Sequence, residues 1–242
     1  MANIKTETSP QLYARIGGLA YLFIIVAGFI GEMFIRNKLI VSGDAAATAN
    51  NIAASPLLWR IGIAGDLTMH VCDGIVALVY YTLLKPVNKN LALLAVLFGL
   101  TQTAVLVANK MNLLMPLFLL ENADYLKAFN AQQLQALAYL SIKAHGYGFG
   151  VGLIFFGVEC LIDGYLIFKS GYLPKVLGVM IQIAGVCYLI NSFALILSPS
   201  LSNLLFPLIL VPPFFGELSM CLWLLIKGVN LTKWKERMAG II

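Results

Sequence analysis

Three ionisable side chains, Asp66, His70 and Asp73, lie inside one apolar stretch of the chain. The stretch covers residues 60–82 and is long enough to cross a bilayer as a helix, which takes about 20 residues. At about 100° per residue, the three side chains fall within about 60° of one another on one helix face. Charged groups in hydrocarbon are costly and usually serve a function. This stripe is therefore the first candidate site.

Other apolar stretches carry polar groups at similar depth. Glu159 and Glu217 fall near the middle of two later stretches, and His145 lies near the outer end of the stretch that holds Glu159. We expect these groups to bind a ligand or protons together with the first three. The candidate ligand- or proton-binding residues are Asp66, His70, Asp73, His145, Glu159, Glu217, Asn109 and Arg60.

The embedded acids outnumber the embedded bases. Bare carboxylates in a medium of low dielectric constant cannot all remain ionised and unpaired. Three outcomes are open: some acids are protonated, some pair with Arg60, Lys110 or a histidine, or a bound cation completes the site. Pairing alone would make them structural links between helices.

The composition predicts a membrane protein. Of 242 residues, 60% are hydrophobic and 11% are charged, whereas a soluble domain has about 25% charged residues. The sequence therefore predicts an all-α, polytopic transmembrane helical bundle that forms a single domain over residues 1–242. The six predicted spans are 14–36, 58–84, 91–119, 137–168, 175–197 and 204–227.

The basic residues set the predicted orientation. Ten of the sixteen Lys and Arg residues flank the spans on the side of the N-terminus, and this bias is typical of the cytoplasmic side. We therefore expect both termini in the cytoplasm. The net charge of +5 has this explanation, so we expect no nucleic-acid partner. The first span is too long for a cleaved signal peptide, so we expect it to stay in the protein.

Local signals refine two connections and one span. Asp44 and Asn130 are each predicted to cap the start of a helix. The fourth span is too long for a bilayer if its preceding helix is continuous with it, so either its first turns project or the glycine-rich segment 146–152 bends it. The four cysteines lie within spans and are expected to stay free, without a metal-type spacing.

Several motifs occur together along the chain. They are ARIGGLAYL at 14–22, GDAAATA at 43–49, RIGIAGD at 60–66, KPVNKNLA at 85–92, HGYG at 145–148 and GELS at 216–219. This ordered set resembles an uncharacterised bacterial integral-membrane family, a six-span domain of unknown function. The resemblance implies a location in the bacterial plasma (inner) membrane, and it brings no activity, substrate or catalytic residue.

The sequence leaves the function open between classes. In the first, Asp66, His70 and Glu217 converge on one cavity that binds or translocates a small cationic or amphipathic ligand or protons. Six spans are few for a transporter, so we then expect a homodimer, with membrane lipids as its surroundings.

Two other classes remain. In an intramembrane enzyme acting on a lipid-like substrate, a metal would be held by His70, Asp66, His145 and Glu217, or a haem by the two histidines. In a structural membrane protein, the polar groups would only join helices. Neither a cofactor nor a catalytic residue follows from the sequence, and no phosphate-binding or hydrolase motif is present.

Overall fold

Long helices account for the regular structure. The computed structural model describes residues 9–121 and 123–240, and every regular element in these ranges is helical. Six helical segments are long and apolar enough to cross a membrane, which confirms the predicted all-α, six-span membrane protein. They are Pro10–Leu39, Pro56–Leu84, Lys89–Leu119, Ala131–Ser170, Lys175–Leu197 and Leu208–Ile226.

Irregular turns interrupt three of these segments. The first joins α1 (Pro10–Ile30), the π-helical η1 (Gly31–Arg36) and α2 (Asn37–Leu39), and the third joins α5 (Lys89–Asn109) to α6 (Met111–Leu119). The sixth joins the short η3 (Leu208–Leu210) to α10 (Val211–Ile226). The uninterrupted segments are α4 (Pro56–Leu84), α7 (Ala131–Ser170) and α8 (Lys175–Leu197), and the shorter elements are α3 (Ala45–Ala54), η2 (Asp124–Ala128), α9 (Pro199–Leu205) and α11 (Leu231–Met238).

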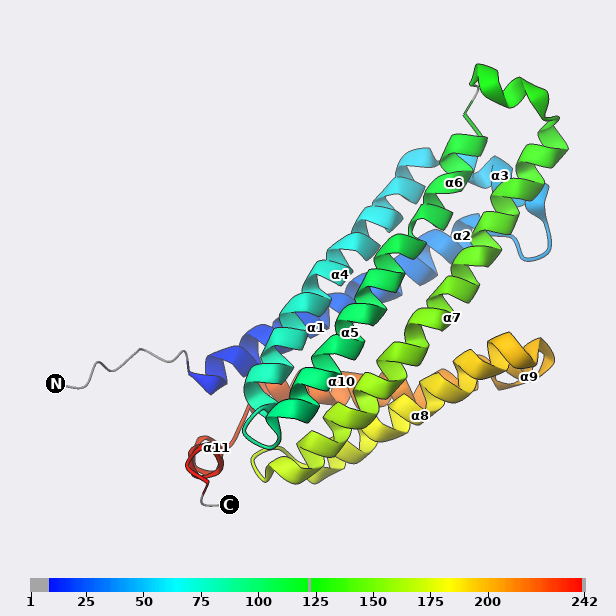
Figure 1. Ribbon diagram of the computed structural model, residues 1–242. Helices are drawn as coiled ribbons and strands as arrows, with labels where there is room; N and C mark the ends of the chain where they lie inside the picture. Colours follow the sequence, from blue (N-terminus) through cyan, green and yellow to red (C-terminus); the bar gives the residue numbers. More distant parts are fainter. Residues whose placement is uncertain (1–8, 122, 241–242) are drawn as a thin grey trace.

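The six spans pack as a closed ring. Helix α4 packs against α5, α5 against α7, α7 against α8, α8 against α10, α10 against α1, and α1 against α4 (Figure 1). Side chains that point inward are therefore surrounded by protein on all sides. Helices α7 and α8 cross closely, since a Cβ at Gly164 would lie 2.6 Å from the carbonyl oxygen of Gly178. Small residues at such crossings let helix backbones approach closely.

Helix α7 is continuous through its glycines. It has 40 residues and is about 60 Å long at 1.5 Å per residue, against about 30 Å of hydrocarbon. Its first turns extend beyond α8 and α9 and lie alongside α3 and α6 (Figure 1). Of the two predicted alternatives, the structure has the helix that is not broken at residues 146–152. Gly148 and Gly152 instead accommodate Asn109 and Leu106 of the neighbouring helix.

Both predicted helix caps are present. The Asp44 carboxylate accepts a hydrogen bond from the Ala47 backbone at 2.8 Å, at the start of α3. Asn130 and Gln133 form a reciprocal capping box at the start of α7. These caps fix where the two helices begin outside the apolar core.

Two apolar clusters lie towards opposite ends of the helix bundle. One gathers around Trp59, Ile63 and Leu113, near α3. The other gathers around Val79, Leu83 and neighbouring residues, near the turn from α7 to α8. The polar stripe of α4 lies between them, because residues 66–73 follow Ile63 and precede Val79. The fold thus places the stripe in a polar layer between two apolar layers.

Candidate functional site

Asp66 lies at the centre of a buried set of ion pairs. Its Oδ2 accepts hydrogen bonds from Arg36 Nη1 at 2.9 Å and from Lys110 Nζ at 2.8 Å. Arg36 also donates through Nε to Glu32 Oε2 at 2.6 Å. Asp66 is 1% exposed and Lys110 is 5% exposed. We call Glu32, Arg36, Asp66 and Lys110 the outer charge cluster; its two acids and two bases balance in formal charge.

Both cations come from interruptions in their helices. Arg36 ends the π-helical turn η1, and π-turns inside helices often occur at functional sites. Lys110 is the junction between α5 and α6, where its N–H bonds to Val107 O at 3.1 Å. At Gly31, a Cβ would lie 3.3 Å from the Arg36 guanidinium and 3.4 Å from the Asp66 carboxylate. The glycine leaves room for this pair.

His145 and Asn109 border the outer charge cluster. His145 Nε2 lies 3.5 Å from Lys110 Nζ. Asn109 Nδ2 donates to the His145 carbonyl at 2.9 Å, and Asn109 Oδ1 accepts from Asn112 Nδ2 at 2.9 Å. Gly148 permits this contact, since a Cβ there would lie 2.3 Å from Asn109 Oδ1. These groups link α5 and α6 to α7.

His70 and Asp73 form the next polar pair along α4. His70 Nδ1 lies 2.9 Å from Asp73 Oδ2, and His70 is 6% exposed. Within the described ranges, His70 Nε2 is buried and has no hydrogen-bond partner. A buried polar atom without a partner needs an explanation, because burial alone is unfavourable. His70 therefore has one ring nitrogen free to exchange a proton or receive a ligand.

Three further acids, two on α7 and one on α10, complete the candidate site. The Glu217 carboxylate accepts a hydrogen bond from the Tyr188 hydroxyl. The Glu159 carboxylate lies directly against the backbone of Gly99, where a Cβ would be 2.4 Å from Oε1. Asp163 is 6% exposed, and its Oδ1 has no partner in the part of the chain that the structure describes. We call Asp73, Glu159, Asp163 and Glu217 the inner acid group.

The members of the inner acid group interact electrostatically. Glu159 is close enough to Asp73, Asp163 and Glu217 to be affected by the charge of each, and Glu217 is similarly affected by Asp73. Over residues 9–121 and 123–240, none of the four carboxylates pairs with a lysine or arginine. The inner acid group thus lacks the compensating cations of the outer charge cluster.

Three buried or partly buried tyrosines lie beside the inner acid group. Tyr21 and Tyr80 lie near enough to Glu217 to be affected by its charge, and Tyr188 bonds to it directly. Tyr188 also packs on Phe156 with ring centroids 5.3 Å apart. Phenol groups can donate to a carboxylate or accept from a protonated one.

The predicted site residues divide between two groups. Asp66 pairs with Lys110, one of the predicted partners, whereas Arg60 is exposed and forms no ion pair in the described ranges. Among the residues that the structure describes, Asp66 and Glu217 have no hydrogen-bond partner in common. The structure therefore joins His70 to Asp73 and places Glu217 in the inner acid group, apart from Asp66.

Sequence reasoning missed Arg36 and Tyr188. The signal for Arg36 was its position four residues after Glu32 at the end of the first apolar stretch, a spacing that forms ion pairs on a helix. Tyr188 had no such signal, because its partner Glu217 lies on another helix.

The two histidines lie in different surroundings. Among the described residues, no three His, Cys, Asp or Glu side chains gather as metal ligands would. His70 Nδ1 lies beside Asp73 and leaves Nε2 without a partner, whereas His145 Nε2 lies 3.5 Å from the Lys110 ammonium, which would repel a metal cation at that nitrogen. All four cysteines are free, as predicted.

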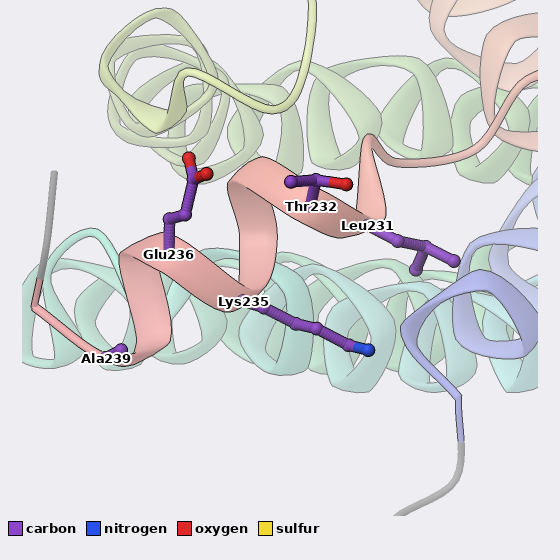
Figure 2. Close-up of a pocket in the computed structure, with 5 residues that line it drawn as sticks. All are labelled: Leu231, Thr232, Lys235, Glu236 and Ala239. Carbon is purple, nitrogen blue, oxygen red and sulfur yellow. The ribbon is translucent and has the colours of Figure 1, made fainter.

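A shallow surface hollow lies on α11. It has a volume of about 380 Å³ (Figure 2) and is lined by Leu231, Thr232, Lys235, Glu236 and Ala239. None of these residues belongs to the outer charge cluster or the inner acid group. The hollow is therefore separate from the candidate site.

The chain belongs to a family of membrane proteins. The model of the domain of unknown function DUF4386 matches residues 16–228, which confirms the resemblance stated from the motifs. An uncharacterized protein of Archaeoglobus fulgidus is 30% identical over 171 residues, covering 71% of this chain and 86% of the relative. No solved structure matches the chain. The chain is thus a multi-pass member of this family, and the family description assigns no function.

Proposed function

We propose that this protein binds protons on the inner acid group and moves them through the helix bundle. The observation that carries the proposal is the contrast in pairing. Asp66 receives an arginine and a lysine, whereas none of the four inner carboxylates receives either within the described residues. Isolated carboxylates are unfavourable in a medium of low dielectric constant, and taking up protons removes that cost.

The packing around the inner acids favours a proton over a larger ligand. Glu159 contacts the Gly99 backbone closely, and Glu217 is occupied by the Tyr188 hydroxyl. A proton adds almost no volume, so it can bind without displacing either contact. The tyrosines can then turn from donors into acceptors as a carboxyl gains or loses its proton.

His70 provides a connection towards the outer charge cluster. It lies four residues from Asp66 and three from Asp73 on one face of α4, a separation of about 6 Å and about 5 Å along the helix. A proton received at Nε2 and released from Nδ1 to Asp73 would pass through one imidazole ring.

A small cationic or amphipathic ligand is the second candidate. Asp73 has a side chain that is 21% exposed, so it is accessible from outside the packed core. Carboxylates beside tyrosine rings are also suited to an organic ammonium group, which aromatic faces attract. This candidate requires a conformation in which the inner acid group opens.

We further propose a topology and a location. The excess of basic residues beside the turns at the α11 end supports cytoplasmic termini. The family resemblance supports the plasma membrane of a bacterial cell, and six spans favour a homodimer as the working unit.

Proton flux into liposomes tests the proposed function. Purified protein is reconstituted in vesicles that hold a pH-sensitive dye, and a potassium gradient with valinomycin supplies the driving potential. We expect dye acidification with the native chain and loss of it in the variant D73N/E159Q/E217Q. The matched control is E32Q, which removes the exposed acid of the outer charge cluster. Flux equal to that of empty vesicles, or equal flux in the triple variant and the native chain, would contradict the proposal.

A further inference from the structure

Helix α11 is held firmly at the end of the bundle. Its connection from α10 is fixed by Gln11, which donates to Lys227 O at 2.8 Å and accepts from Val229 N at 3.1 Å. Gly228 adopts φ +69°, and a Cβ there would lie 2.5 Å from the Gln11 amide. The left-handed backbone and the contact both require glycine. The chain is thereby directed out of the bundle at a defined point.

The start of α11 is anchored as well. Asn230 N donates to Tyr172 O at 3.1 Å, and the Asn230 side chain caps the helix by accepting from Lys233 N at 3.2 Å. The Tyr172 hydroxyl in turn donates to Leu83 O at the end of α4, and burial raises the pKa of Tyr172 above its usual range. This phenol therefore remains a neutral donor. The anchor joins α11 to the ends of α4 and α7.

The helix lies across the bundle axis. In Figure 1, α11 is seen end-on at the end where α4 meets α5 and α7 meets α8, whereas the spanning helices are seen along their length. A helix in this position lies in the plane of a membrane surface. Its turns run beside the headgroups of the surrounding lipid.

The two faces of α11 differ in chemistry. At about 100° per residue, Leu231, Trp234 and Met238 fall within about 60° of one another. Trp234 packs against the apolar cluster of the bundle, while Leu231 and Met238 are 41% and 47% exposed. Amphipathic helices with such exposed apolar residues insert them at the headgroup boundary.

Basic side chains surround this end of the molecule. Lys235 extends away from Glu236 on the opposite side of α11 (Figure 2). Within the described ranges, none of the basic residues of α11 or of the neighbouring turns pairs with an acid. They are Lys85, Lys89, Lys169, Lys175, Lys227, Lys233, Lys235 and Arg237.

We propose that α11 and the turns beside it bind anionic phospholipids of the membrane in which the protein resides. The exposed Leu231 and Met238 enter the acyl boundary, and the basic side chains hold the headgroup phosphates. Each lysine or arginine near an anionic surface contributes to binding, and uncompensated positive charge is complementary to these lipids. This site is independent of the inner acid group and of the proposed proton transport.

Native mass spectrometry of the purified full-length protein tests this inference. Phosphatidylglycerol and phosphatidylcholine with the same acyl chains are titrated separately, and bound lipid is counted. We expect tighter binding of phosphatidylglycerol, and about a hundredfold loss of that preference in K233Q/K235Q/R237Q, from the contribution of three basic groups. The matched control, K38Q/K127Q/K143Q, removes three exposed lysines at the opposite end and should retain the preference.

Two further measurements keep the test decisive if the triple variant does not fold. The variant K233R/K235R preserves charge and should bind as the native chain does. Added salt should weaken phosphatidylglycerol binding to the native chain, because screening acts on exposed charges. Equal binding of the two lipids, insensitivity to salt, or an equal loss in the control triple variant would overturn the inference. Loss of proton flux in D73N/E159Q/E217Q would leave it unaffected.

Discussion

The outer charge cluster and the inner acid group meet the same physical problem in opposite ways. Both place carboxylates in the interior of an apolar bundle. In the outer charge cluster, Asp66 is matched by Arg36 and Lys110, and in the inner acid group the carboxylates contact tyrosines, glycine and one histidine. Buried charge alone therefore does not identify a functional site. The pairing of that charge distinguishes a structural link from a group that can exchange protons.

The largest effect is expected from removing the central acid of the outer charge cluster. D66N leaves Arg36 and Lys110 buried without their carboxylate, and breaking a buried pair in this way costs about 3–5 kcal/mol. Equilibrium unfolding in mixed micelles, followed by circular dichroism, measures the loss. D73N is the matched control on the same helix face and should lose much less. Equal losses in the two variants would remove the distinction between the groups.

A smaller effect is expected where Glu159 meets Gly99. The Cβ of G99A would lie 2.4 Å from Glu159 Oε1, so the carboxyl group must move within a packed interior. Overpacking of this kind costs about 1–3 kcal/mol, and proton flux should fall with it. G65A on α4 is the control, since nothing lies within 4 Å of its Cβ. Native flux and stability in G99A would show that the position of Glu159 is unimportant.

The hydrogen bond between Tyr188 and Glu217 should contribute less. Y188F removes the donor and keeps the ring, so we expect about 1 kcal/mol of lost stability together with slower proton flux. Y165F is a suitable control because Tyr165 is exposed on α7. If both substitutions left the flux unchanged, the tyrosines would be packing residues only.

The smallest effect is expected at the exposed edge of the outer charge cluster. E32Q removes the partner of Arg36 Nε, but Glu32 has a side chain that is 55% exposed. Exposed pairs contribute about 0–1 kcal/mol, and Arg36 keeps its bond to Asp66. The same unfolding measurement should detect little change. A loss as large as that of D66N would mean that the cluster depends on all four charges.

The sequence predicted the helices better than it predicted which side chains pair between them. The spans, the two caps and the polar stripe of α4 follow from local patterns of hydropathy and spacing. Which cation meets Asp66 depends on the register between α1 and α4, which is set by contacts such as Gly17 with Val79 and Gly31 with Asp66. Those residues are distant in the chain. The contact therefore had no local signal.

Irregular backbone explains the remaining differences. Arg36 reaches Asp66 from the end of a π-helical turn, and Lys110 does so from the junction of two helices. Hydropathy patterns assume regular helices and do not predict such interruptions. The proximity of Asp73, Glu159 and Glu217 likewise depends on packing between three helices, so only their separate depths could be predicted from hydropathy.

Infrared spectroscopy of the protein in lipid bilayers tests directly whether the inner acid group carries protons. A protonated carboxyl group has a carbonyl stretching band that an ionised carboxylate lacks, so substitutions assign each band to a residue. We expect such a band at neutral pH that is lost in E159Q or E217Q and is unchanged in D66N. A spectrum without protonated carboxyl bands, or a band that only D66N removes, would contradict the protonation of the inner acid group.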